Sequence, residues 1–148
     1  MSFTVDGTSG LTFPNSTTQA SAGGMTLLGT LTTTSGTTQT LSGLTLTPYK
    51  FLQITVNAVT TSSAGGGALT FGGQSISEAF TSSSGNMYGG LSMSLDNGVY
   101  FGSFGLQGSV NRGCPGKTSY TTASTSIVFA WSDSSSFTGG TIKVYGIA

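Results

Sequence analysis

Residues 87–107, MYGGLSMSLDNGVYFGSFGLQ, decide the fold because they predict a β-hairpin more clearly than any other stretch of the chain. In the first half, four large apolar residues lie at odd-numbered positions: Met87, Leu91, Met93 and Leu95. Residues an even number of positions apart lie on the same face of a strand. Asn97 and Gly98 favour a tight turn, and a second apolar run follows them. The pattern predicts two antiparallel strands that bury one face.

The same period of two extends outward from this hairpin. Residues 49–59, YKFLQITVNAV, predict a half-buried strand with one apolar face, formed by Leu52, Ile54, Val56 and Ala58. Residues 126–132, SIVFAWS, are apolar on both parities and predict a central strand covered on both sides. Both stretches therefore predict strands, and only the second is predicted to be central.

The remaining stretches predict shorter strands. Residues 25–34 and 38–46 are rich in threonine, which suits a pleated strand, and a turn at Ser35 and Gly36 separates them. ALTF and QSIS flank Gly72 and Gly73 as a hairpin, and residues 141–148, TIKVYGIA, close the domain. Because no helical stripe accompanies these strands, the chain is predicted to be an all-β sandwich or barrel over residues 25–148.

Residues 1–24 differ from the rest of the chain. Their large apolar residues are few and lie among turn-forming residues: Phe3, Val5, Leu11 and Phe13. Such a segment cannot bury itself, so we predict an N-terminal extended arm that ends at Gly23 and Gly24. The arm is either a loose terminus or an anchor whose apolar residues contact a neighbouring subunit or partner protein.

The composition excludes several classes of function. Ser, Thr and Gly make up half of the 148 residues, and charged residues make up 5%, four of each sign. Four scattered cations cannot neutralise a row of phosphates, so no nucleic-acid partner is expected. With no His and a single Cys, we expect no enzyme, no catalytic residue, no cofactor and no metal site.

The same composition favours an assembly. Edge strands are normally guarded by charge, and a surface of Ser, Thr and Gly is tolerable where it is buried between subunits. We therefore expect a symmetric oligomer. The opening Met-Ser-Phe-Thr lacks a basic start, and there is no apolar run of about 18 residues, so neither a signal peptide nor a membrane span is expected in a protein made in a cytoplasm.

One predicted loop concentrates charge. Residues 110–120, VNRGCPGKTSY, contain Arg112 and Lys117, which are half of all the cations. They are candidate contacts to an acidic partner, or solvated charges at a loop tip shaped by Gly113, Pro115 and Gly116. Cys114 between them is expected to be a small loop or interface residue rather than a reactive thiol.

Three stretches resemble virion surface proteins of tailed bacteriophages. Residues 10–19, GLTFPNSTTQ, resemble a "TFPDGT-Q" element of tail-fibre and other virion proteins. Residues 28–59, LGTLTTTSGTTQTLSGLTLTPYKFLQITVNAV, resemble the opening of their small β-sandwich modules, and residues 126–148, SIVFAWSDSSSFTGGTIKVYGIA, resemble the closing strands. Together they cover about two thirds of the chain.

The resemblance implies a jelly-roll-like antiparallel β-sandwich, usually a homotrimer, on the virion surface. The expected role is a capsid decoration or cement protein, whose arm contacts the major capsid protein or another virion protein. A short head or tail fibre that binds host surface glycans is the alternative. The decoration role is favoured over it, because an arm and one sandwich leave no room for the shaft of a fibre. Most motif residues are expected to serve packing and turns, among them Tyr49, Lys50, Trp131, Gly139, Gly140 and Gly146. Trp131 or an exposed Tyr is the candidate sugar platform.

Overall fold

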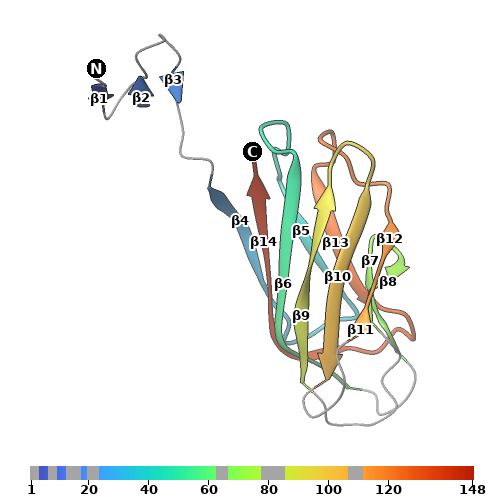
Figure 1. Cartoon of the computed structure of the whole chain (residues 1–148). Helices are drawn as coiled ribbons and strands as arrows, with labels where there is room; N and C mark the ends of the chain where they lie inside the picture. Colours follow the sequence, from blue (N-terminus) through green and yellow to red (C-terminus); the bar gives the residue numbers. More distant parts are fainter. Residues whose placement is uncertain are drawn as a thin grey trace.

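The computed structural model describes residues 4–6, 10–12, 18–19, 24–62, 67–77, 86–106 and 112–148. These residues form strands, turns and irregular segments and no helix, and the strands that they form pair antiparallel. Two sheets face each other as a β-sandwich (Figure 1). The predicted fold class is therefore confirmed.

The larger sheet has the strand order β11-β10-β9-β6-β14-β4, and β12 also pairs with β10. The bounds of its strands are as follows: β4 Met25–Thr32, β6 Phe51–Thr61, β9 Met87–Ser94, β10 Val99–Leu106, β11 Arg112–Gly113, β12 Gly116–Lys117 and β14 Phe137–Ile147. The predicted hairpin of residues 87–107 is confirmed as β9 and β10. Its turn is held by Asn97, whose side-chain oxygen accepts a hydrogen bond from the Val99 N–H at 3.0 Å.

The smaller sheet has the order β5-β13-β7-β8. Its strands are β5 Thr38–Ser42, β7 Leu69–Phe71, β8 Gln74–Ser75 and β13 Ser126–Trp131. The central position of β13 is confirmed, but its predicted coverage on both faces is wrong, because Val128 and Ala130 are partly exposed. A two-layer sandwich covers only one face of each sheet, and these two side chains lie on the outer face of the smaller sheet.

The core lies between the two sheets and follows the alternation of the strands. The inward residues of β6 and β13 are at most 3% exposed: Leu52, Ile54, Val56, Ile127, Phe129 and Trp131. Phe71 sits in the middle of an aromatic cluster, with ring centroids 5.0 Å from Tyr120, 5.4 Å from Phe129 and 5.9 Å from Tyr100. Burial of these large side chains is the main source of stability.

The two threonine-rich strands do not pair with each other. β4 belongs to the larger sheet and β5 to the smaller one, so residues 33–37 cross from one layer to the other. Thr33 anchors the crossing: it is fully buried, and its hydroxyl donates to the carbonyl of Gly139 at 2.6 Å. The strands were predictable from their pattern, while their separation into two sheets was not.

One residue of the predicted apolar face of residues 49–59 is misplaced. Ala58 is only partly buried, and its neighbour Val59 is fully buried instead. The register of β6 against β9 shifts between Val56 and Val59, and Ala58 has a positive φ of 53°. This bulge moves the inward parity by one residue, which a strict period of two cannot predict.

The N-terminal segment forms three very short strands: β1 Thr4–Asp6, β2 Gly10–Thr12 and β3 Thr18–Gln19. They pair with one another, and in the described part of the chain they pair with no strand of the sandwich. The sandwich begins with β4 at Met25, where the predicted boundary between arm and domain lies. The predicted hinge residue Gly23 lies outside the described residues.

Candidate functional site

The segment that carries Arg112 and Lys117 is an edge strand, not the loop tip that was predicted as one alternative. Arg112 pairs with Phe104 and Lys117 with Val99, and both pairings belong to one continuous register along β10. Pro115 interrupts this strand because it has no N–H to donate, which is tolerated at a sheet edge. A proline and two cations are the usual guards of such an edge. The Lys117 side chain is exposed, as a partner contact requires.

Cys114 lies in this edge strand and is partly buried. Its N–H donates to the carbonyl of Gly102 at 2.9 Å, and its side chain packs against the core. Burial raises the pKa of the thiol, although backbone hydrogen bonds at Gly102 and Cys114 act in the opposite direction. A thiol with a raised pKa is largely protonated at neutral pH and is a poor nucleophile.

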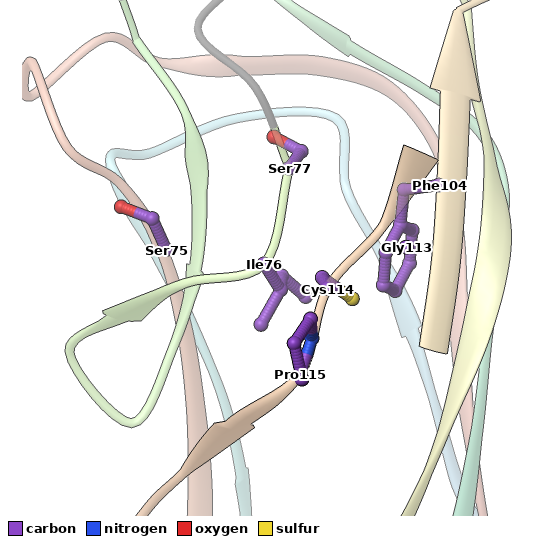
Figure 2. A pocket seen from close by; sticks show the side chains of 7 residues that line it. All are labelled: Ser75, Ile76, Ser77, Phe104, Gly113, Cys114 and Pro115. Carbon is purple, nitrogen blue, oxygen red and sulfur yellow. The ribbon is translucent and has the colours of Figure 1, made fainter. Parts of the chain in front are cut away.

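A pocket of about 370 Å³ opens beside Cys114. Figure 2 shows the side chains of Ile76, Cys114 and Pro115 gathered there, with Phe104 on the neighbouring strand β10. The described residues that line the pocket are Ser75, Ile76, Ser77, Phe104, Gly113, Cys114 and Pro115. These described residues offer hydroxyl groups and an apolar wall.

Trp131, one candidate for a sugar platform, is buried inside the sandwich. It is 3% exposed, and its ring centroid lies 5.4 Å from that of Phe137. The interpretation of Trp131 as a glycan platform is therefore wrong, because a ring in the core offers no face to a ligand. The packing interpretation is confirmed for Trp131 and for Gly146. The ring of Tyr49 lies so close to Gly146 that a Cβ added there would be 2.6 Å from the ring.

The arm residues named as partner contacts are only partly described. Val5 and Leu11 are register partners in the β1–β2 pair, so the backbone brings them side by side. Phe3 and Phe13 lie outside the described residues. The arm and the Arg112–Lys117 segment belong to different sheets, so strand pairing does not join the two groups of candidates.

Sequence reasoning missed an exposed apolar surface on the outer face of the larger sheet. We call five large side chains there the outer patch; they are 45–67% exposed: Met25, Leu27, Phe51, Val99 and Phe101. Register brings them to the same end of the sheet, where β4 and β6 begin, β14 ends and the β9–β10 turn lies (Figure 1). In the sequence, these residues could have been recognised as large apolar side chains at strand positions that point away from the core.

The outer patch is organised as rows across the sheet. In one row Met25, Ile147 and Phe51 are successive register partners. In the next row Leu27 pairs with Tyr145, and Tyr145 pairs with Gln53. Both rows then cross β9 at serine residues before they reach Val99 and Phe101 on β10. The patch thus has one apolar end on β4, β14 and β6 and another on β10.

Among the described residues, no group of three or more His, Cys, Asp or Glu could hold a metal ion, and no helix could cross a bilayer. The described residues offer three candidate contact surfaces: an arm, an edge with two cations, and an apolar patch on the outer face. No family model matches the chain, and comparison with curated proteins and with solved structures found no significant match.

Proposed function

We propose that the protein is a non-enzymatic structural protein on the virion of a tailed bacteriophage, most simply a capsid decoration or cement protein. In this proposal it is a homotrimer that assembles in the host cytoplasm and stabilises the head shell. Its N-terminal arm contacts the major capsid protein or another virion protein. The proposal requires no cofactor.

One observation carries this proposal: an apolar surface lies where the arm joins the sandwich. Met25 and Leu27 follow the arm directly, are more than half exposed, and no charged residue occurs between Asp6 and Lys50. Exposed apolar patches on small domains mark contact surfaces. A sandwich with such a surface beside its arm suits a protein that is held in a shell by its neighbours. The resemblance of residues 10–19, 28–59 and 126–148 to phage virion proteins supports the same assignment.

A short head or tail fibre that binds host glycans is the second candidate. The observation that favours it is the exposure of aromatic rings on β9 and β10, where Phe101 is 67% and Tyr88 is 39% exposed. The face of an exposed aromatic ring can stack on the apolar face of a sugar. The cations Arg112 and Lys117 at the adjacent edge would suit an anionic glycan.

The two candidates differ in what a particle loses without the protein. A decoration protein contributes mechanically, so particles that lack it should release their genome at lower temperature or milder osmotic shock, with adsorption to host cells unchanged. A fibre protein should show the reverse pattern. Both properties are measured on the same pair of particle preparations, and unchanged stability would contradict the decoration role.

Charge substitutions sharpen this comparison. In a fibre, Arg112→Ala combined with Lys117→Ala should lower adsorption, and the effect should shrink as salt rises, because exposed charges are screened within about 8–10 Å at physiological ionic strength. Lys143→Ala is the matched control, since Lys143 is an exposed cation on β14 of the same sheet. In a decoration protein neither variant should change adsorption.

A further inference from the structure

We infer that the outer patch, together with the open edge of β4, binds a second copy of this chain. The inference deepens the proposed function, because it names the surface through which the proposed trimer would form. It rests on three features of the described residues: the area of the patch, the absence of charge on one side of the sandwich, and the contrast between the two edges of the larger sheet.

The area of the outer patch suits a subunit contact. A large side chain covers about 150–250 Å² when it is fully buried, so five half-exposed ones leave on the order of 400 Å² of apolar surface. This is within the range of the largest patches on soluble monomers, which are often functional, and is about half of one partner's share in a stable interface. The adjoining edge of β4 supplies further contact area.

The two edges of the larger sheet differ in charge and in proline content. The edge formed by β11 and β12 carries Pro115 and the cations Arg112 and Lys117. The opposite edge is β4, MTLLGTLT, which has neither a charge nor a proline. In the described part of the chain β4 pairs only with β14, so its second row of N–H and C=O groups is left for another strand or for water. Unguarded edges of this length invite pairing with another chain.

The side of the sandwich beside β4 is uncharged across both layers. β5, the edge strand of the smaller sheet, adjoins β4, and the side chain of Leu41 on β5 packs on Gly29 of β4. All of residues 7–49 lack charge, so both edge strands share this property. A charge-free surface cannot attract a partner by opposite charge, but it also does not repel an identical copy. A second copy of the chain is therefore the occupant that this chemistry fits.

The layout of the patch also fits a closed ring. The outermost strands of the patch, β4 and β10, are four strand spacings apart in the sheet, about 19 Å. A subunit of a trimer contacts two neighbours through different surfaces. A patch with two apolar ends can meet both neighbours at once. Charges lie at its rim: Lys50 directly before Phe51, Lys117 opposite Val99, and Lys143 two residues before Tyr145.

A pair of substitutions on one strand tests the inference. Phe51 and Asn57 are both exposed, both on β6 and both on its outer face, but only Phe51 belongs to the patch. Sedimentation of the full chain at micromolar concentration, with reductant to keep Cys114 reduced, should give a trimer for wild type and for Asn57→Lys. Phe51→Lys should weaken assembly at least tenfold and give monomer at the same concentration. Leu27→Lys, on β4, should do the same.

Far-UV circular dichroism confirms that each variant is folded, which is expected because these side chains are largely solvent-exposed in the subunit. A trimer that persists in both Phe51→Lys and Leu27→Lys would overturn the inference, and so would loss of the trimer in Asn57→Lys. A wild-type monomer over the whole concentration range would also overturn it. The decoration role is scored separately, by binding of the wild-type protein to particles that lack it, so the two proposals fail in different measurements.

Discussion

Gly140 of β14 lies directly against the backbone of Ala58 in β6, and both residues have positive φ angles, 96° and 53°. A Cβ added at Gly140 would overlap the carbonyl group of Ala58. The register of β14 against β6 shifts between Gly139 and Thr141, and that of β6 against β9 shifts between Val56 and Val59. Adjacent irregularities in two strands thus fit into each other, and the pair sets which residues of β6 face the core.

This contact predicts a large effect for Gly140→Ala. The substitution strains the backbone at positive φ and also forces backbone atoms of Ala58 to move, so unfolding free energy should fall by about 2–4 kcal/mol. Gly73→Ala is the control, because Gly73 also has a positive φ, 79°, but an added Cβ there meets nothing within 4 Å. It should cost about 1–2 kcal/mol. Equal losses in urea denaturation would show that the Ala58 contact contributes nothing.

The buried position of Trp131 predicts a large loss of stability for Trp131→Ala. Its side chain is 3% exposed and packs against Phe137, so its removal should leave a cavity and lower unfolding free energy by about 3–5 kcal/mol. Trp131→Phe keeps an aromatic ring in the same place and should lose clearly less. Chemical denaturation of both variants measures the difference, and near-native stability of Trp131→Ala would contradict the packing described above.

The arm can be removed without touching the core. Deletion of residues 1–22 should leave the sandwich folded, because its first strand begins at Met25 and the arm strands pair only with one another in the described chain. The truncated protein should keep the circular dichroism spectrum and melting behaviour of the sandwich but fail to enter particles. Incorporation at the wild-type level would exclude the arm as the anchor.

Burial predicts a slow reaction of Cys114 with alkylating reagents. Its thiol pKa is raised by burial, so little thiolate is present at neutral pH in the folded protein. Iodoacetamide should therefore label Cys114 more slowly in the native protein than in denaturant, and the native rate should rise as the solution is made alkaline. Equal rates in both states at neutral pH would contradict this environment.

The same burial predicts a loss of stability at alkaline pH. Burial raises the pKa values of Tyr100 and Tyr120 as well as that of Cys114, so these groups hold their protons more tightly in the folded chain. Their contribution is fully present below the unfolded pKa values, about 8.5 for thiols and about 10 for phenols, and is lost as the pH rises through the higher folded values. Cys114→Ala should remove the thiol's part of the decline. A pH-independent unfolding free energy over this range would contradict the prediction.

The sequence by itself determined most of the longer strands and the face that most of them bury. The alternation in residues 87–107 and the Asn97–Gly98 turn predicted β9, β10 and their pairing, because a tight hairpin is specified by residues close together in the chain. The pattern of Leu52, Ile54 and Val56 predicted the buried face of β6 for the same reason, since successive side chains of a strand point to opposite sides. These are local properties, and local residues encode them.

Only the tertiary structure decided how strands distant in sequence pair and what the outer face carries. β4 and β5 follow each other in the chain yet enter different sheets, and β4 pairs with β14 more than a hundred residues away. The bulge at Ala58 depends on Gly140, and the Arg112–Lys117 edge depends on β10. The outer patch likewise exists only because register brings Met25, Ile147 and Phe51 together. Alternation in the sequence predicts which face of a strand a residue occupies, but it does not predict which strand lies beside it. Strand pairing depends on the packing of the whole sandwich.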